Sequence, residues 1–221
     1  MLDIFDILGP VMVGPSSSHT AGAVRIGRMA RTLLGAEPVR AEIGLHGSFA
    51  ETGQGHGTDK ALVAGLLGMK PDDLGIPDSF AIADNQGLTF HFHTVSLRDA
   101  HPNTAVVEVE SADGKKLTIQ AASTGGGRIR VDRLDGVEVN FTGMFNTLVV
   151  RHQDVAGELS RILNELSVGG INIANMRLSR DRRGGDGLTV VETDQKVPAD
   201  ALERLRAVYG VQTVTYYEKE D

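Results

Sequence analysis

The regular alternation of apolar segments from residue 146 onward is the feature that most constrains the fold of this chain. Apolar stretches rich in β-branched residues, which are typical of strands, lie at 146–154, 171–180, 188–194 and 212–218. One amphipathic stretch follows the first strand segment and another follows the third. The pattern therefore predicts a βαββαβ unit in the C-terminal part of the chain.

The two amphipathic stretches of this unit have the spacing of helices that bury one face. Their apolar positions are Leu159, Ile162, Leu163 and Leu166 in the first stretch and Leu202, Leu205 and Val208 in the second. Gly169 and Gly170 end the first helix, and Pro198 begins the second. The charged, glycine-rich segment 181–187 predicts an exposed loop between the central strands. We therefore predict a ferredoxin-like sandwich.

The first part of the chain is predicted to form a separate α/β domain, in which glycine-rich segments interrupt strands and helices. Segments 21–34 and 58–68 predict helices that each follow a polar loop. A length of 221 residues is enough for two domains of ordinary size. We predict an α+β chain with domains at 1–143 and 146–221.

Composition argues against several classes of function. The chain has 22 Lys and Arg against 29 Asp and Glu, spread along its length, so no basic surface for nucleic acid is expected. It has no cysteine, which excludes disulfides, thiolate nucleophiles and an iron-sulfur cluster held by this chain. The apolar N-terminal segment contains Asp3 and Asp6, and no apolar run approaches the roughly 20 residues that a bilayer requires. We therefore expect a cytoplasmic protein.

The first polar segment, Gly-Pro-Ser-Ser-Ser-His-Thr at 14–20, directly precedes a predicted helix. A Ser or Thr hydroxyl there can cap the helix by accepting a free backbone N–H, which is worth about 1 kcal/mol. The same helix start can instead bind a carboxylate or phosphate, because its amides and dipole face the ligand. Both interpretations stay open, and His19 would lie beside a bound anion. The candidate anion-binding residues are Ser16, Ser17, Ser18 and Thr20.

The second polar segment, at 45–60, is predicted to be a strand end, a glycine-rich loop and a helix start. Gly53, Gly55 and Gly57 alternate, but the spacing fits neither the dinucleotide fingerprint nor the Walker A loop. We expect a concavity lined by backbone that admits a small ligand, the alternative being a flexible surface loop. The candidate ligand-binding residues are His46, Gly47, Ser48, His56, Gly57 and Thr58.

The third polar cluster lies at the two ends of a predicted antiparallel hairpin. This hairpin covers 105–123, with Asp113-Gly114 at the positive φ angles of its turn. His-Pro-Asn-Thr at 101–104 precedes it and Ser-Thr-Gly-Gly-Gly at 123–127 follows it, so the hairpin would bring both segments together. Their imidazole, amide and hydroxyl groups suit a small zwitterion, although each could instead satisfy loop backbone. The candidate residues are His101, Asn103 and Thr104.

Two further pairs of titratable residues share a strand face. His91 and His93 have a spacing that metal sites sometimes use. No further ligand is close in the sequence, so we interpret them as a solvated or partner-facing edge and expect no metal site in this chain. Glu108 and Glu110 are interpreted as solvated hairpin residues rather than an acid/base pair.

Four segments together resemble the beta subunit of bacterial iron-sulfur-dependent L-serine dehydratases: GPSSSHTAGAVRIG, LHGSFAETGQGHGTDKALVAGLLG, HPNT and STGGG. The resemblance covers the whole chain, and the βαββαβ unit resembles the ACT domain of those subunits. It implies that the first domain has the allosteric substrate binding fold shared with certain D-3-phosphoglycerate dehydrogenases. It also implies conversion of L-serine to pyruvate and ammonia, with a 4Fe-4S cluster held by a cysteine-containing alpha subunit.

Elimination of water from serine requires removal of a weakly acidic α-proton and loss of hydroxide, so a neutralised carboxylate, a base and a Lewis acid are needed. We hypothesise that the helix start at 16–20 holds the substrate carboxylate and that His19 is the catalytic base. His46, His56, His101 and Asn103 would orient the substrate. The partner's cluster would bind the leaving hydroxyl.

The ACT-like unit resembles domains whose effector site lies between two paired copies. The site uses the turn after the first strand and the start of the second strand, and the family pattern commonly has proline where this chain has Ala156. The alternative is that the unit only pairs through its open sheet edge. The candidate effector-binding residues are His152, Asp154, Val155, Ala156, Gly157, Asn172 and Ile173.

Other classes of function also fit parts of the sequence. A non-catalytic regulatory protein could sense serine through both domains. A pyridoxal phosphate dehydratase needs a Schiff-base lysine, and the candidate near a glycine-rich loop, Lys60, fits a helix start better. A fragment of phosphoglycerate dehydrogenase would have both folds, but this sequence contains no dinucleotide-binding domain.

Overall fold

The computed structural model describes residues 12–14, 16–180 and 182–219. The chain divides into two compact units, Met1–Asp135 and Gly136–Asp221. Each unit contains both helices and strands, which confirms the predicted α+β class. Among the described residues, none of the helices combines the length and the apolar character needed to cross a membrane.

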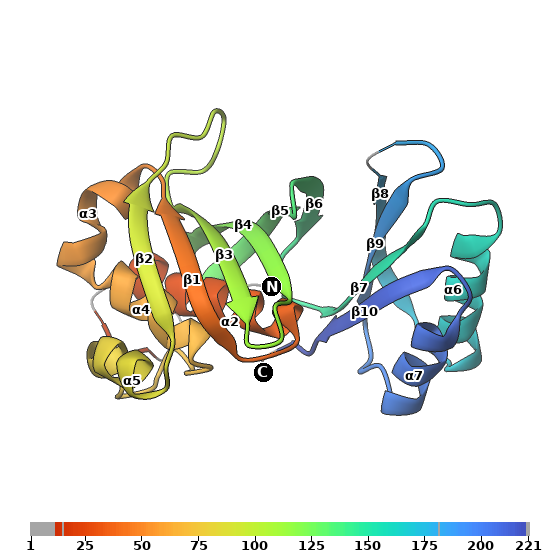
Figure 1. Ribbon diagram of the computed structural model, residues 1–221, viewed down its shortest axis with the longest axis horizontal. Helices are drawn as coiled ribbons and strands as arrows, with labels where there is room; N and C mark the ends of the chain where they lie inside the picture. The colour runs from red at the N-terminus through yellow and green to blue at the C-terminus, as the bar shows by residue number, and fades with distance from the viewer. Residues whose placement is uncertain (1–11, 15, 181, 220–221) are drawn as a thin grey trace, which may run out of the picture. The chain divides into compact units, whose positions relative to one another are not determined.

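The first unit is built on a mixed sheet. Its strands are β1 (Pro38–Leu45), β2 (Thr89–Thr94), β3 (Thr104–Ser111), β4 (Lys116–Gly125) and β5 (Arg128–Leu134). They lie in the order β2-β1-β3-β4-β5 (Figure 1). β1 and β2 run parallel, and the remaining neighbours are antiparallel. The predicted hairpin is the β3–β4 pair, but only Gly114 has a positive φ, of 82°; Asp113 instead accepts a hydrogen bond from the Ser111 hydroxyl.

The helices of the first unit pack on one face of this sheet (Figure 1). They are η1 (Ser17–Ala21, a π-helical turn), α2 (Gly22–Leu34), α3 (Ser48–His56), α4 (Thr58–Leu66), η2 (Ile76–Asp78) and α5 (Ser79–Asn85). Two glycines let α2 and α4 touch backbone to backbone. A Cβ on Gly27 would lie 2.3 Å from the carbonyl oxygen of Leu62, and one on Gly65 would lie 2.1 Å from that of Val24.

Helix α3 corrects the prediction of a glycine-rich loop. Its Gly53 and Gly55 each cost roughly 1 kcal/mol in a helix relative to alanine, so the local sequence argues against this element. Phe49 is fully buried in α3 and lies with its ring centroid 5.3 Å from that of His19, so packing outweighs the unfavourable propensity. Gly57, with a φ of 70°, separates α3 from α4. The polar groups of this segment are therefore presented by a helix rather than by a loop.

The second unit confirms the predicted βαββαβ order. After β6 (Val137–Phe141), its elements are β7 (Asn146–Gln153), α6 (Glu158–Val168), β8 (Ile173–Arg180), β9 (Asp186–Thr193), α7 (Ala199–Ala207) and β10 (Val211–Tyr217). The antiparallel sheet has the order β10-β7-β9-β8 (Figure 1). Ile162, Leu166 and Leu205 are fully or almost fully buried against Leu148 and Val191 of the sheet, as the helical spacing predicts.

Candidate functional site

The first polar segment folds into one π-helical turn, η1, that leads into α2. Ser16 caps this turn, because its hydroxyl accepts the backbone N–H of His19 at 3.3 Å. The same hydroxyl lies 3.3 Å from Nδ1 of the His19 ring. The capping interpretation therefore holds for Ser16, while Ser17 and Ser18 are half-buried in the turn and His19 is turned into the protein.

His19 is the meeting point of the first and second polar segments. Its side chain is buried at 9% exposure, and Nε2 lies 3.0 Å from Oγ1 of Thr52 and 3.3 Å from Oγ of Ser48. The ring of His56 lies edge-on, with its centroid 4.9 Å away. Ser48, Thr52 and His56 recur every four residues on α3, so one face of this helix surrounds the imidazole.

The hydrogen bonds around His19 favour one neutral tautomer. Thr52 donates its hydroxyl hydrogen to the carbonyl oxygen of Ser48 at 2.8 Å, which leaves its Oγ1 to accept from Nε2–H of His19. Ser16 already accepts a backbone N–H, so its own hydrogen is available to Nδ1. This network places the proton of the neutral ring on Nε2 and the lone pair on Nδ1.

The surroundings of His19 disfavour its charged form. Burial, and after it the neighbouring His56, lower the pKa of His19 below the ordinary value of 6.5, while a hydrogen bond with the Ser48 backbone opposes this shift. The imidazole is therefore neutral near pH 7. A neutral imidazole held by hydroxyl groups can accept a proton, which is the property required of a general base.

Three buried hydroxyl groups in this part of the first unit have no hydrogen-bond partner among the described residues. They belong to Thr20 of η1, Thr58 at the start of α4 and Ser123 of β4, each at most 3% exposed. Ser123 lies directly against the start of α2, because a Cβ on Gly22 would be 2.1 Å from its Oγ. An unsatisfied buried hydroxyl costs about 1–3 kcal/mol, so each of these groups would be stabilised by a polar partner.

The third polar segment joins the second through the backbone. The carbonyl of Thr104 accepts the N–H of His46, and the carbonyl of Asn103 accepts the N–H of Ser123 at 2.9 Å. Gly47 has a φ of 54°, and a Cβ there would lie 2.7 Å from the carbonyl oxygen of Pro102. The sequence correctly predicts that the ends of the hairpin meet.

Among the described residues, the rings of His46 and His101 form hydrogen bonds with nearby backbone rather than with His19. Nδ1 of His46 accepts the N–H of Leu97 at 3.3 Å, and Nδ1 of His101 accepts that of Asn103 at 3.1 Å. Thr104 is fully buried and donates to the carbonyl of His101 at 2.6 Å. These contacts stabilise the loops beside the His19 site.

Thr52 is a site residue that the sequence interpretation missed. It lies within the second polar segment, but the prediction of a loop there gave no reason to select it. A helical spacing of four residues links it to Ser48 and His56, and this periodicity was the signal available in the sequence.

Comparison with known proteins now places the chain. The family model "Serine dehydratase beta chain" matches residues 1–85, and the model "ACT domain" matches residues 146–208. "Probable L-serine dehydratase, beta chain" of Bacillus subtilis is 40% identical over 212 residues, which cover 96% of each chain. "L-serine dehydratase, beta chain" of Peptoniphilus asaccharolyticus is 34% identical over 215 residues, or 97% of each chain. The chain belongs to the serine dehydratase beta chain family.

A more distant similarity links this beta chain to a different class of enzyme. "D-3-phosphoglycerate dehydrogenase" of Archaeoglobus fulgidus is 25% identical over 199 residues, which cover 89% of this chain and 37% of that protein. The resemblance described in the sequence analysis also links the first domain to certain D-3-phosphoglycerate dehydrogenases.

The first half of the expected effector site lies at the end of β7 and in the turn that follows it. His152 is buried, and both of its ring nitrogens have partners: Nδ1 donates to the carbonyl of Gln153 at 2.9 Å and Nε2 accepts from Thr189 at 2.8 Å. Asp154 accepts from Arg180 at 2.9 Å and from the Gly184 N–H at 3.0 Å. Val155, Ala156 and Gly157 are exposed and lead into α6.

The second half of that site lies at the opposite end of the same sheet. β7 pairs His152 with Gly187 at one end and Asn146 with Thr193 at the other, and Ile173 also pairs with Thr193. At about 3.4 Å per residue, the two ends are roughly 20 Å apart. Asn172, next to Ile173, donates its side-chain amide to Asp194. One copy of the ACT domain therefore does not bring the two halves together.

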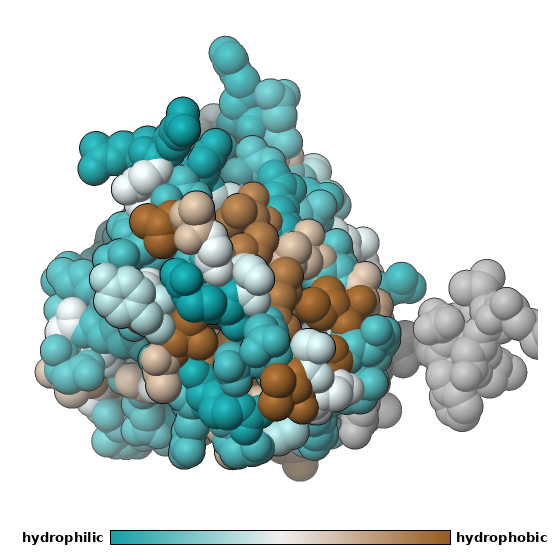
Figure 2. All heavy atoms as spheres, turned by 90° about the vertical axis from the view of Figure 1, so that its right-hand side faces the viewer, coloured by the Kyte–Doolittle hydropathy of each residue, from teal (hydrophilic) through white to brown (hydrophobic). Residues whose placement is uncertain are grey.

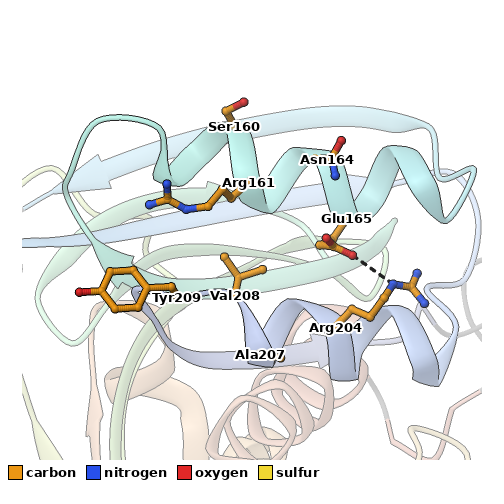
Figure 3. Close-up of a pocket in the computed structure, with 8 residues that line it drawn as sticks. All are labelled: Ser160, Arg161, Asn164, Glu165, Arg204, Ala207, Val208 and Tyr209. Atoms are coloured by element: carbon orange, nitrogen blue, oxygen red, sulfur yellow. Dashed lines mark hydrogen bonds and ion pairs between the residues drawn. The ribbon is translucent and has the colours of Figure 1, made fainter.

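A groove of about 580 Å³ runs between the helices of the ACT domain (Figure 3). Its two arginines already pair with carboxylates: Arg161 with Glu158, and Arg204 with Glu165 at 3.1 Å and with Asp200. The face seen in Figure 2 carries small, separate apolar patches among hydrophilic residues. The groove thus has no unpaired charged group among these side chains that would select a ligand.

Proposed function

We propose that this chain is the beta subunit of an L-serine dehydratase and that it converts L-serine to pyruvate and ammonia together with an iron-sulfur-bearing alpha subunit. The observation that carries the proposal is the 40% identity to a beta chain of that description over 96% of both sequences. The neutral, buried His19 supports it, because the reaction needs a base at the α-carbon of the substrate.

In this proposal η1, the turn that leads into α2, binds the substrate. The serine carboxylate lies at the start of this turn, where the first backbone amides and the unpartnered hydroxyl groups of Thr20 and Ser123 would supply donors. The substrate displaces the Ser16 hydroxyl from Nδ1 of His19, Nδ1 then accepts the α-proton, and the ring becomes an imidazolium. Thr52 stabilises that cation by accepting a hydrogen bond from Nε2–H.

The side chains of the His19 site do not fit an iron-sulfur cluster. The site offers hydroxyl and imidazole groups, and the chain contains no cysteine, whereas such clusters are held chiefly by thiolates. The proposed cluster therefore belongs to the alpha subunit, where it would supply the Lewis acid for the leaving hydroxyl. A cytoplasmic location accompanies this proposal.

The ACT domain is proposed to bind an effector between two copies. The 20 Å separation estimated within one copy supports this arrangement, because a second copy can place its Asn172 and Ile173 against the turn at 154–157. Self-association and effector binding would then depend on each other.

Anaerobic formation of pyruvate from L-serine tests the proposal. The purified chain is assayed alone and then after mixing with a cysteine-containing partner subunit reconstituted with iron and sulfide. Activity in the mixture only is the expected result. Activity of the chain alone would contradict the shared site, and serine binding without activity in either sample would favour a regulatory protein.

A further inference from the structure

The open face of the first sheet carries a group of side chains that the proposed function does not use. β1 and β2 are parallel neighbours, with Glu42 opposite His91 and Gly44 opposite His93. Alternate residues of a strand point to the same face, so Glu42, His91 and His93 share one side of the sheet. The buried Ala41 and Ile43 face the helices on the other side.

The donor atoms of these three residues lie close together. One donor atom from each residue can be chosen so that all three are within 4.8 Å of one another. Nδ1 of His91 is 3.2 Å from Oε2 of Glu42. Two ligands of a tetrahedral zinc ion, each about 2.0–2.1 Å from the metal, are about 3.3 Å apart. The observed separation therefore matches two ligands of one ion.

The third donor needs only a small adjustment to join them. The rings of His91 and His93 are nearly parallel, with an angle of 14° and a centroid distance of 6.2 Å. His93 lies over Gly44, because a Cβ there would be 3.1 Å from its Nε2. Both histidines are exposed, so their rings can rotate toward Glu42 without displacing the core.

One carboxylate oxygen of Glu42 faces the histidines. Arg40 donates to Oε1 of Glu42 at 3.1 Å, which orients the carboxylate and leaves Oε2 toward His91. Glu108 lies opposite Glu42 on β3 and adds negative charge to the same face.

We propose that Glu42, His91 and His93 bind one divalent transition-metal ion on the open face of the first sheet, with zinc as the first ion to test. Two imidazoles and a carboxylate form a recognised ligand set for zinc, and the remaining coordination position faces solvent and takes water or an external ligand. The site is separate from His19 and does not depend on the proposed function.

Zinc binding to the full chain tests this site. Equilibrium dialysis at pH 7.5 measures the number of zinc ions bound, and cobalt, which gives visible absorption bands in such sites, reports the ligand geometry. We expect one zinc ion to be lost, or its affinity to fall at least tenfold, in H91A and in H93A.

A matched pair of variants separates ligation from general attraction to negative charge. E42Q and E108Q each remove one negative charge from the same face of the sheet, but only the first removes a ligand. E42Q should weaken zinc binding at least tenfold, and E108Q should change it less than twofold. The proposal is overturned if the wild-type chain binds no zinc, if H91A and H93A bind as it does, or if E108Q loses as much affinity as E42Q.

Discussion

Replacement of Thr52 by valine tests the role of the hydroxyl group that holds His19. Thr52 accepts from Nε2–H at 3.0 Å, whereas Ser48 lies farther away at 3.3 Å. Valine has nearly the same shape but cannot accept the hydrogen bond. The loss should be greatest when His19 is an imidazolium, because hydrogen bonds to charged groups are worth about 1.5–3 kcal/mol.

Ser48 compensates for part of this loss, so we take the lower end of that range, about 1.5 kcal/mol. Such a change corresponds to roughly a tenfold decrease in kcat. The imidazolium is destabilised relative to the neutral ring, so the pKa of His19 should fall further and the acid limb of the pH profile should move to lower pH. Stability should change little, because Thr52 is exposed.

Steady-state turnover of the assembled enzyme between pH 5 and 9 measures both effects. T52S keeps the hydroxyl group and should recover most of the activity, which distinguishes the hydrogen bond from a change in helix packing. If T52V keeps the turnover and the pH profile of the wild type, Thr52 does not stabilise a charged His19 and the proposed network is wrong.

Three further results are expected. G65A should lose about 1–3 kcal/mol of stability in thermal denaturation, because its Cβ would lie 2.1 Å from the carbonyl oxygen of Val24. G55A is the control and should lose none, because its Cβ would meet nothing within 4 Å. Equal losses in the two variants would contradict the packing argument. The pKa of His19 in the folded chain lies below 6.5, so the unfolded chain binds this proton more readily. The free energy of unfolding should therefore fall as the pH drops below about 6.5. Denaturant titrations of H19Q should lack this contribution to the pH dependence of stability. L178K, at an exposed position of the edge strand β8, should weaken both self-association in sedimentation and amino-acid binding in calorimetry, and loss of only one would separate the two.

The C-terminal fold could be predicted because its helices and strands have clear periods. Leu159, Ile162, Leu163 and Leu166 form an unbroken helical stripe, and the structure buries Ile162 and Leu166 and half-buries the other two. Helix α3 could not be predicted in the same way. Gly53 and Gly55 weaken its helical propensity, and its stability depends on the burial of Phe49, which is a property of the folded chain.

Two other features depend on contacts between residues far apart in the sequence. His91 and His93 gain Glu42 as a neighbour only because β1 and β2 are paired in register. The resemblance to ACT domains places the effector site between two copies, and the strand order puts the turn at 154–157 and the start of β8 at opposite ends of the sheet of one copy. Strand pairing of this kind cannot be deduced from motifs that are close together in the sequence.

His19 is proposed as the base of a site that two subunits share. The most direct test of this role is turnover of L-serine by the anaerobically reconstituted enzyme with H19Q in place of the wild-type chain, and with E108Q as the control at an exposed residue outside both proposed sites. General base catalysis typically contributes 10²–10⁴-fold, so H19Q should lose at least 100-fold in kcat while E108Q stays within twofold of wild type. If H19Q kept near-normal turnover, the assignment of His19 as the base would be wrong.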